Sequence, residues 1–173
     1  GVVFMPKNDA RLLFDKADEE WDAGNTKKAV KLFSMAAEQG DLSALVRLGF
    51  AYDLGLGVSK NKTKALQLYK RAARHGDEFA MSNIGTVYRD MGNFTRARFW
   101  FLKAFKSGDG DAALELAKLY LKRKARGDIT RASKYLNLAI SARFITEASV
   151  EEAELLLKRL KQQTTRARVG HKA

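Results

Sequence analysis

Apolar residues recur along the chain at helical spacing, and the same set of positions returns every 32 to 36 residues. The pattern aligns on four alanines, Ala29, Ala65, Ala97 and Ala132, which are separated by 36, 32 and 35 residues. Apolar residues follow each alanine at offsets of three, four, seven and eight, and these offsets trace one face of an α-helix. The chain therefore predicts four copies of one amphipathic helix.

Polar residues and glycines mark the ends of these helices. An Asn or Asp lies four residues before each alanine and is suited to accept hydrogen bonds at a helix start: Asn25, Asn61, Asn93 and Asp128. Eleven residues after the first three alanines lie Gly40, Gly76 and Gly108, each followed by Asp. A glycine ends a helix by turning left-handed, and the Asp after it is placed to cap the next helix.

A second helical pattern lies between each Gly-Asp pair and the next cap. The segments ALVRLGFAY, AMSNIGTVY and ALELAKLY share an early Ala, a small residue at position 49, 85 or 117, and a tyrosine three residues later. A glycine inside a helix costs roughly 1 kcal/mol relative to alanine, so its repetition predicts a close crossing with the neighbouring helix. Each copy is therefore a helical hairpin.

The hairpins divide the chain into predicted segments. An N-terminal extension covers 1–8, and four helical-hairpin repeats fill 9–145 at about 9–40, 41–76, 77–108 and 109–143. SVEE at Ser149–Glu152 has the form of a capping box, and an apolar stripe follows it. This predicts a capping helix at 146–163 that covers the end of the array, followed by a basic flexible tail at 164–173.

The stretch GLGVSKNKT, which starts at Gly55, has the glycines, lysine and threonine of a phosphate-binding loop. Such a loop needs glycine at 56 and 61 before Lys62 and Thr63, but the chain has Leu56 and Asn61 there. The repeat pattern accounts for every residue of the stretch, so it is interpreted as the connector of a hairpin.

LGFAYDLGLGVSKNKTKALQLYKRAARHG, residues 48–76, resembles the Sel1-like branch of the tetratricopeptide repeat superfamily. The likeness rests on a Leu-Gly and Tyr in the first helix, a Gly-x-Gly-Val connector, and Ala, an aromatic residue and Ala-Ala in the second. The third hairpin has plain tetratricopeptide spacing. The resemblance covers about residues 9–142 and implies an all-α α-solenoid: a right-handed superhelix of four helix-turn-helix repeats plus a C-terminal capping helix.

The resemblance also implies a partner-binding groove, lined by the first helix of each repeat and usually without catalysis. The side chains that it turns inward are Phe14, Trp21, Arg47, Phe50, Asn83, Thr86, Arg89, Leu114, Lys118 and Lys122. For Trp21 and Phe50, a place in the core is an equal alternative. Apolar and cationic groups together suit another protein that is acidic or carries an acidic peptide or helix. The main hypothesis is therefore a non-enzymatic protein-binding module acting as an adaptor, scaffold or inhibitor-like partner.

Charge supports an alternative hypothesis. The 173 residues carry a net charge of +12, which favours encounter with anionic partners. Basic residues cluster at Lys60, Lys62 and Lys64, at Lys122, Arg123, Lys124 and Arg126, and at Lys158, Arg159, Lys161, Arg166, Arg168 and Lys172. A polyanion-binding module for nucleic acid, acidic polysaccharide or anionic lipid would use such patches. No aromatic residues interleave with these clusters, so no stacking platform for single strands is predicted.

Catalytic chemistry finds no support in the residues. The chain has no cysteine, and its two histidines, His75 and His171, have no nucleophile or second histidine nearby. Carboxylates at 18–22 and 151–154 fit solvated helix faces. We therefore predict no catalytic, cofactor-binding or metal-binding residue, no cofactor and no enzyme.

No apolar run of about 18 residues is present, so no integral membrane insertion is expected. Cysteine-free composition fits the bacterial cytoplasm and the periplasm equally. Because the chain begins with Gly, an export signal removed from upstream is compatible with it.

Overall fold

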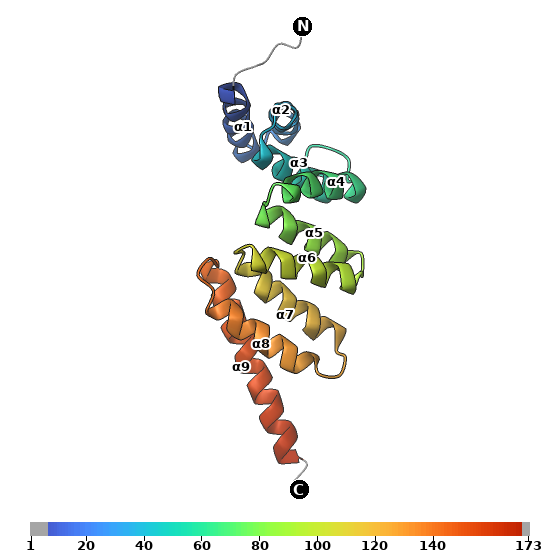
Figure 1. Cartoon of the computed structure of the whole chain (residues 1–173), viewed down its shortest axis with the longest axis vertical. Helices are drawn as coiled ribbons and strands as arrows, with labels where there is room; N and C mark the ends of the chain where they lie inside the picture. The colour runs from blue at the N-terminus through green and yellow to red at the C-terminus, as the bar shows by residue number, and fades with distance from the viewer. Residues whose placement is uncertain (1–6, 171–173) are drawn as a thin grey trace. The chain divides into compact units, whose positions relative to one another are not determined.

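The structure, a computed structural model, describes the backbone of residues 7–170 and the side chains of residues 9–163. Within this range it consists of nine α-helices and no strand, which confirms the predicted all-α fold (Figure 1). The helices are α1 (Lys7–Asp22), α2 (Thr26–Glu38), α3 (Leu42–Leu54), α4 (Lys62–Arg74), α5 (Glu78–Asp90), α6 (Phe94–Lys106), α7 (Asp111–Arg123), α8 (Asp128–Ile140) and α9 (Glu147–Gly170).

The chain divides into two compact units, residues 1–87 and residues 88–173. In the first unit α1 packs on α2, α2 on α3, and α3 on α4. In the second unit α6 packs on α7, α7 on α8, and α8 on α9, with a smaller contact between α7 and α9. Within α1–α4 and within α6–α9, helices that follow one another in the chain are thus packing neighbours, as expected for stacked hairpins.

Helices α3 and α4 cross closely at Gly49. A Cβ atom at Gly49 would lie 2.7 Å from Cε1 of Tyr69, whose ring is buried on α4. The predicted role of this glycine is confirmed, because any larger residue would push against a ring that has no room to move. Burial of the ring, and then the negative charge of Asp53, raises the pKa of Tyr69.

The connector between α3 and α4 explains the glycines that had suggested a phosphate loop. Gly55 and Gly57 both have positive φ, 81° and 71°. A Cβ atom at Gly57 would lie 2.5 Å from the carbonyl oxygen of Thr26, at the start of α2. The connector therefore packs against the neighbouring hairpin, and it joins two helices as predicted.

Several predicted helix caps are confirmed. Asn61 Oδ1 accepts a hydrogen bond from Lys64 N at 2.9 Å, and Asn93 Oδ1 accepts one from Arg96 N at 3.1 Å. Asp41 caps α3 in the same way, through Ala44 N at 2.8 Å. The glycines at 40, 76 and 108 all have positive φ. The corners of the hairpins therefore lie where the sequence placed them.

Two predicted caps are wrong. Asn25 stands at the N-cap position of α2, but its side-chain oxygen accepts no capping bond, while its amide nitrogen donates to Glu20 Oε2 at 2.9 Å. Asp128 is the first residue of α8 rather than its cap, since Gly127 occupies the cap position with a φ of 79°. The Asp128 carboxylate is therefore available to the arginines around it.

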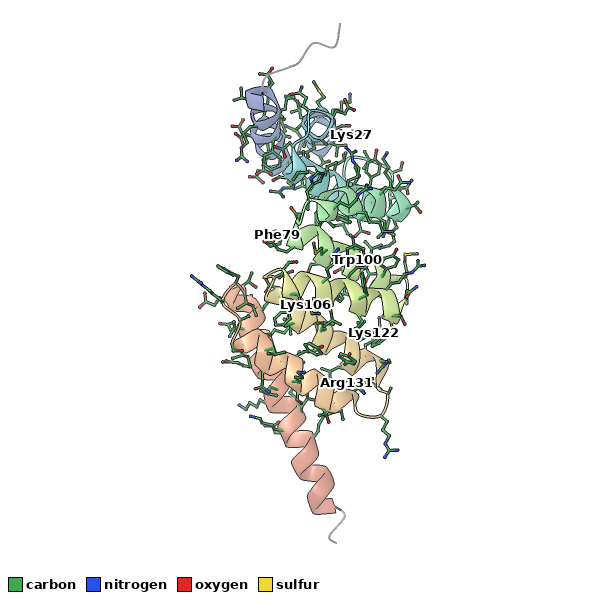
Figure 2. All side chains as sticks on the ribbon, in the orientation of Figure 1. Lys27, Phe79, Trp100, Lys106, Lys122 and Arg131 are labelled. Carbon is green, nitrogen blue, oxygen red and sulfur yellow. The ribbon has the colours of Figure 1, made fainter. Side chains whose placement is uncertain are left out.

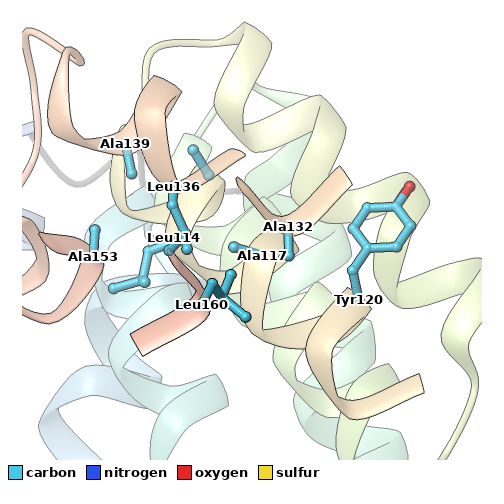
Figure 3. Close-up of a cluster of buried hydrophobic side chains, with 9 residues drawn as sticks. Leu114, Ala117, Tyr120, Ala132, Leu136, Ala139, Ala153 and Leu160 are labelled. Atoms are coloured by element: carbon cyan, nitrogen blue, oxygen red, sulfur yellow. The ribbon is translucent and has the colours of Figure 1, made fainter. Parts of the chain in front are cut away.

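The C-terminal helix closes the core of the second unit. Ala153 and Leu160 of α9 pack with Leu114 of α7 and Leu136 of α8 (Figure 3). Thr146 Oγ1 accepts a hydrogen bond from Ser149 N, so Thr146 caps α9 and the predicted capping box at Ser149 is wrong. The helix continues to Gly170, so the backbone of residues 164–170 is helical where a flexible tail was predicted.

Candidate functional site

The first helices of the first unit share an aromatic surface. Phe14 and Trp21 of α1 lie against the buried ring of Phe33 on α2, with ring centroids 5.6 and 6.0 Å away. The Trp21 ring is 6.2 Å from that of Phe50 on α3, which is 38% exposed. Trp21 is half-buried, with one ring contact to the core residue Phe33 and one to the exposed Phe50. Three predicted groove residues are therefore brought together.

The charged residue predicted beside this surface is neutralised. Arg47 Nη2 on α3 lies 2.7 Å from Asp18 Oδ1 on α1. On the same helix as Asp18, the carboxylate of Glu20 accepts from Lys28 Nζ at 2.5 Å, and this hydrogen bond lowers the pKa of Glu20. Ion pairs thus link α1 to its neighbours, and Arg47 already has an anionic partner within the unit.

Asn83 and Thr86, the predicted groove residues of α5, are half-buried in the first unit. In the second unit Arg89 and Lys118 converge on Glu115 of α7. Arg89 donates to the Glu115 carboxylate, and Lys118 Nζ lies 3.2 Å from Glu115 Oε1. Lys118 Nζ also lies 2.7 Å from Glu152 Oε2 of α9. Both cations are therefore committed to carboxylates of the same unit.

The position of Lys118 at the junction of α7 and α9 affects its titration. Burial alone would lower the pKa of Lys118. The hydrogen bond to Glu152 and the charge of Glu115 outweigh this effect, so the pKa is raised. The ammonium group therefore stays charged within its ion pairs.

Leu114 is a correction to the predicted groove. Its side chain is only 2% exposed and belongs to the core cluster that α7, α8 and α9 build together (Figure 3). The reason is that α9 contacts α7, so the face of α7 that an open repeat would expose is covered. Leu114 is a core residue.

A small pocket of about 210 Å³ lies at the end of α7 in the second unit. It is lined by Arg89, Gly92, Phe94, Leu119, Lys122 and Arg123. Phe94 and Leu119 give it an apolar lining, and the Arg123 guanidinium carbon lies 4.1 Å from the centroid of the Phe94 ring. Lys122 is exposed and forms no ion pair with any other described residue. The pocket thus unites two predicted residues, Arg89 and Lys122, with apolar groups that the sequence pattern did not single out.

Asp128 holds the arginine of this pocket in place. Arg123 donates to the Asp128 carboxylate through Nε at 2.8 Å and Nη2 at 2.5 Å, and Ala125 N donates to it at 2.8 Å. The hydrogen bond from Arg123 is the main cause that lowers the pKa of Asp128 to about 2. Sequence spacing hinted at this pair, since the two residues flank one short turn, but the pattern assigned Asp128 to a helix cap.

Positive charge is distributed unequally between the two helices of the hairpins. The second helices α2, α4, α6 and α8 have net charges of +2, +5, +4 and +1. The first helices α1, α3, α5 and α7 have net charges of −3, 0, −1 and +1. Helices α4 and α6 contain no acidic residue at all. The largest net positive charges therefore lie on the second helices α4 and α6.

The remaining candidates for chemistry are few. The structure places no three His, Cys, Asp or Glu residues of its described part where they could hold a metal ion. His75 is exposed at the end of α4, and His171 lies outside the described residues. Among the helices of residues 7–170, none combines the length and the apolar character that crossing a membrane requires.

Comparison with protein families identifies the repeats. The Sel1 repeat profile matches residues 22–41, 42–77 and 110–143, which together make up more than half of the chain. A tetratricopeptide repeat profile matches residues 80–107. The third hairpin is thus the one with plain tetratricopeptide spacing, as its shorter connector predicted. No curated protein matches the chain by sequence.

Solved structures share the fold. A Sel1 repeat protein from Oxalobacter formigenes is 23% identical with a TM-score of 0.71, and the match covers 88% of this chain and 63% of that one. The protein c5321, described as a protective antigen of uropathogenic Escherichia coli with an SLR fold, is 26% identical with a TM-score of 0.68 over 76% of this chain and 30% of its own. MamA is 17% identical with a TM-score of 0.63 over 92% and 90%. The chain spans less than two thirds of the first two proteins, and the likenesses show an all-α helical repeat solenoid.

Proposed function

Because the chain belongs to the Sel1 repeat family, we propose that it is a non-enzymatic module that binds a partner protein through surfaces of its first helices. Sel1 and tetratricopeptide repeats generally mediate protein–protein interaction, and such families are typically non-catalytic scaffolds. The roles that fit are those of an adaptor, a scaffold or an inhibitor-like partner.

The observation that carries the proposal is the aromatic surface of the first unit. Phe50 is accessible on α3, and Trp21 behind it is held in position by its contact with the buried Phe33 ring. Aromatic side chains that are already ordered lose little conformational entropy on binding, and they are enriched among the residues that dominate interface energies. The surface is therefore suited to receive apolar side chains of a partner.

The second unit offers a site of different character. Its pocket at Phe94 and Leu119 is smaller than the ~300–1,000 Å³ of typical small-molecule sites, so its size suits a single partner side chain. Lys122 at its rim forms no ion pair among the described residues and would attract a carboxylate beside that side chain. We propose an acidic partner, or one with an acidic peptide or helix, for this site.

Affinity capture followed by identification of the bound proteins tests the first-helix assignment. We expect Phe50→Ser to lose the proteins that the unaltered chain captures, because the exposed anchor of the aromatic surface is gone. Met35→Ser is the matched control, since Met35 is an exposed apolar residue of α2, the second helix of the same unit. If the Phe50→Ser chain captures the same proteins in the same amounts, the first-helix assignment is wrong.

The excess of positive charge on α4 and α6 favours a second candidate, a polyanion-binding module. Some cations of the predicted basic patches are already paired: Lys62 with Asp53 at 2.9 Å, and Arg123 with Asp128. Others, such as Lys60 and Lys64, are exposed. A polyanion site predicts retention on heparin that falls steeply with salt. If the unaltered chain elutes from heparin at the same salt concentration as a variant with Lys60→Gln and Lys64→Gln, the result would argue against a polyanion site.

A further inference from the structure

One face of α6 carries cations and aromatic rings together. Its residues follow one another at helical offsets of three, four, seven and ten, and we name them the α6 stripe: Arg96, Phe99, Trp100, Lys103 and Lys106. The other face of the helix, with Ala97, Phe101 and Ala104, is buried in the unit. The stripe therefore points away from the core, and Figure 2 shows Trp100 and Lys106 on this helix.

Of the two aromatic side chains of the stripe, Phe99 is exposed and Trp100 is half-buried. The side chain of Phe99 is 59% exposed. Its ring meets that of Trp100 edge to face, with centroids 5.6 Å apart and planes at 90°. Lys103 Nζ lies 5.2 Å from the centroid of a Trp100 ring. Exposed apolar groups with polar residues around them are typical of interaction sites.

The cations of the stripe differ from those of the first helices. Arg96, Lys103 and Lys106 form no ion pair with a carboxylate in the part of the chain that the structure describes. Three of the four predicted groove cations on the first helices are paired, Arg47 with Asp18, Arg89 with Glu115 and Lys118 with Glu152. Because α6 has no acidic residue, its positive potential is not compensated within the helix.

We propose that the α6 stripe docks an acidic segment of the partner protein, with an apolar side chain of that segment on Phe99 and its carboxylates toward Arg96, Lys103 and Lys106. The inference rests on the proposed function for the partner being a protein. It assigns the acidic part of the partner chiefly to a second helix, because the predicted groove cations of the first helices other than Lys122 already have carboxylate partners.

Two features favour a protein segment over a nucleic acid. A base would need an open ring face for stacking, but Lys103 lies over the Trp100 ring and the Phe99 ring meets it at 90°. The stripe is also short, since Arg96 and Lys106 are ten positions apart and the stripe therefore spans about 15 Å of helix. That length matches about three turns of a partner helix. Trp and Arg are, in addition, the residues most enriched among interface anchors.

The fluorescence of Trp100 tests the proposal. The chain has two tryptophans, so Trp21→Phe leaves Trp100 as the single reporter. The probe is a synthetic amphipathic peptide of glutamates with leucine and phenylalanine, and its control is the same peptide with glutamine for every glutamate. We expect the acidic peptide to shift the Trp100 emission in a saturable way. The peptide affinity should fall roughly tenfold between low and physiological salt. An equal shift with the glutamine peptide would overturn the charge argument.

Substitutions locate the binding within the chain. We expect Phe99→Ser to lower the affinity for the acidic peptide roughly tenfold, and the pair Lys103→Gln and Lys106→Gln to lower it by about the same factor. The matched control is the pair Arg71→Gln and Arg74→Gln on α4, which removes the same charge from a helix without exposed aromatic rings. Its effect should stay within about twofold. Equal losses in both pairs would show that binding follows net charge and overturn the proposal.

Other ligands and the proposed function are separated by further arms. If a dT20 oligonucleotide or phosphatidylserine vesicles shift Trp100 more than the acidic peptide and displace it, the stripe is a nucleic-acid or lipid site and the proposal is wrong. Met35→Ser on α2, outside the stripe and the aromatic surface, should leave the peptide affinity unchanged. If the unaltered chain does not bind the acidic peptide, but its capture of partner proteins still depends on Phe50, this inference is overturned and the proposed function is not.

Discussion

The cations of the first helices α3, α5 and α7 differ from those of the second helix α6 in their pairing with carboxylates. On the first helices, Arg47, Arg89 and Lys118 each lie against a carboxylate of the same unit. On the second helix α6, Arg96, Lys103 and Lys106 have no carboxylate partner among the described residues. The chain is strongly basic as a whole, but the largest net positive charges belong to the second helices α4 and α6. Net charge alone therefore does not reveal which surface attracts an anionic partner.

This difference separates stability from recognition. An ion pair between helices contributes to packing, and removing one member leaves the other without its partner. An unpaired surface cation contributes little to folding, so its removal changes mainly the electrostatic field that a partner meets. Substitution of a paired residue should therefore lower stability, whereas substitution of an unpaired cation on α6 should lower the affinity for an acidic partner.

The largest loss of thermal stability is expected where a second helix carries a paired carboxylate, in Asp128→Asn. Asp128 is 1% exposed and accepts from Arg123, Arg131 and Ala125 N. Its pKa is about 2, below the ordinary 3.8. The carboxylate therefore stabilises the fold fully above about pH 4, and this stabilisation is lost as the pH falls toward 2.

Thermal unfolding of both chains between pH 7 and pH 2 checks this prediction. The melting temperatures should differ most at neutral pH and converge in acid. A constant difference across that window would show that the charge of Asp128 is not the stabilising feature.

A smaller effect is expected from separating a first helix from its second helix by Gly49→Ala. The added methyl group would lie 2.7 Å from the buried Tyr69 ring. Overpacking typically costs about 1–3 kcal/mol, which exceeds the ~1 kcal/mol that alanine gains in helix propensity. Urea unfolding should therefore show a lower midpoint, and a raised midpoint would mean that the crossing is looser than described.

Glu115→Gln should convert a first-helix surface toward the character of α6. Arg89 loses its Glu115 partner, and Lys118 keeps only Glu152. We expect a loss of about 1 kcal/mol in unfolding free energy, because these side chains are partly exposed. At the same time the affinity for the acidic peptide should rise. If the affinity for the acidic peptide does not rise, the pairing of Arg89 and Lys118 with Glu115 is not what keeps an acidic segment from this surface.

The smallest effect on folding is expected from Lys106→Gln. Lys106 is exposed and has no carboxylate partner among the described residues. Its substitution should leave the unfolding free energy within about 0.5 kcal/mol. A larger change in the urea midpoint would mean that the stripe takes part in folding, and the contrast between the two kinds of helix would weaken.

Local sequence patterns were sufficient for the hairpins. Gly49 and Asn61 report directly on a close crossing and a helix start, because each requirement acts within one hairpin. The fate of Leu114 was not predictable in this way, since it depends on α9 returning to cover α7. Arg89 and Glu115 are 26 residues apart, and no local pattern indicates that they meet.

The α6 stripe was missed for a different reason. The repeat pattern counts Trp100 among the apolar residues that follow Ala97 and leaves Phe99 out, and the predicted basic patches consist of lysines and arginines close together in the sequence. The stripe spreads its cations over three turns of one helix, so they become a surface only when the helix is folded. Asn25 shows the same limit, because its side chain prefers a carboxylate that lies across the turn.

Photo-crosslinking from single positions in cells tests the central claim most directly. A photoreactive residue is placed at position 50 on a first helix, at position 99 on the α6 stripe, and at position 35 on α2 as the control, and the crosslinked peptides are identified by mass spectrometry. We predict that positions 50 and 99 crosslink to the same partner protein and that the peptide crosslinked at position 99 is rich in acidic residues. Position 35 should not crosslink to this partner. Protein adducts that do not differ among the three positions would contradict the account.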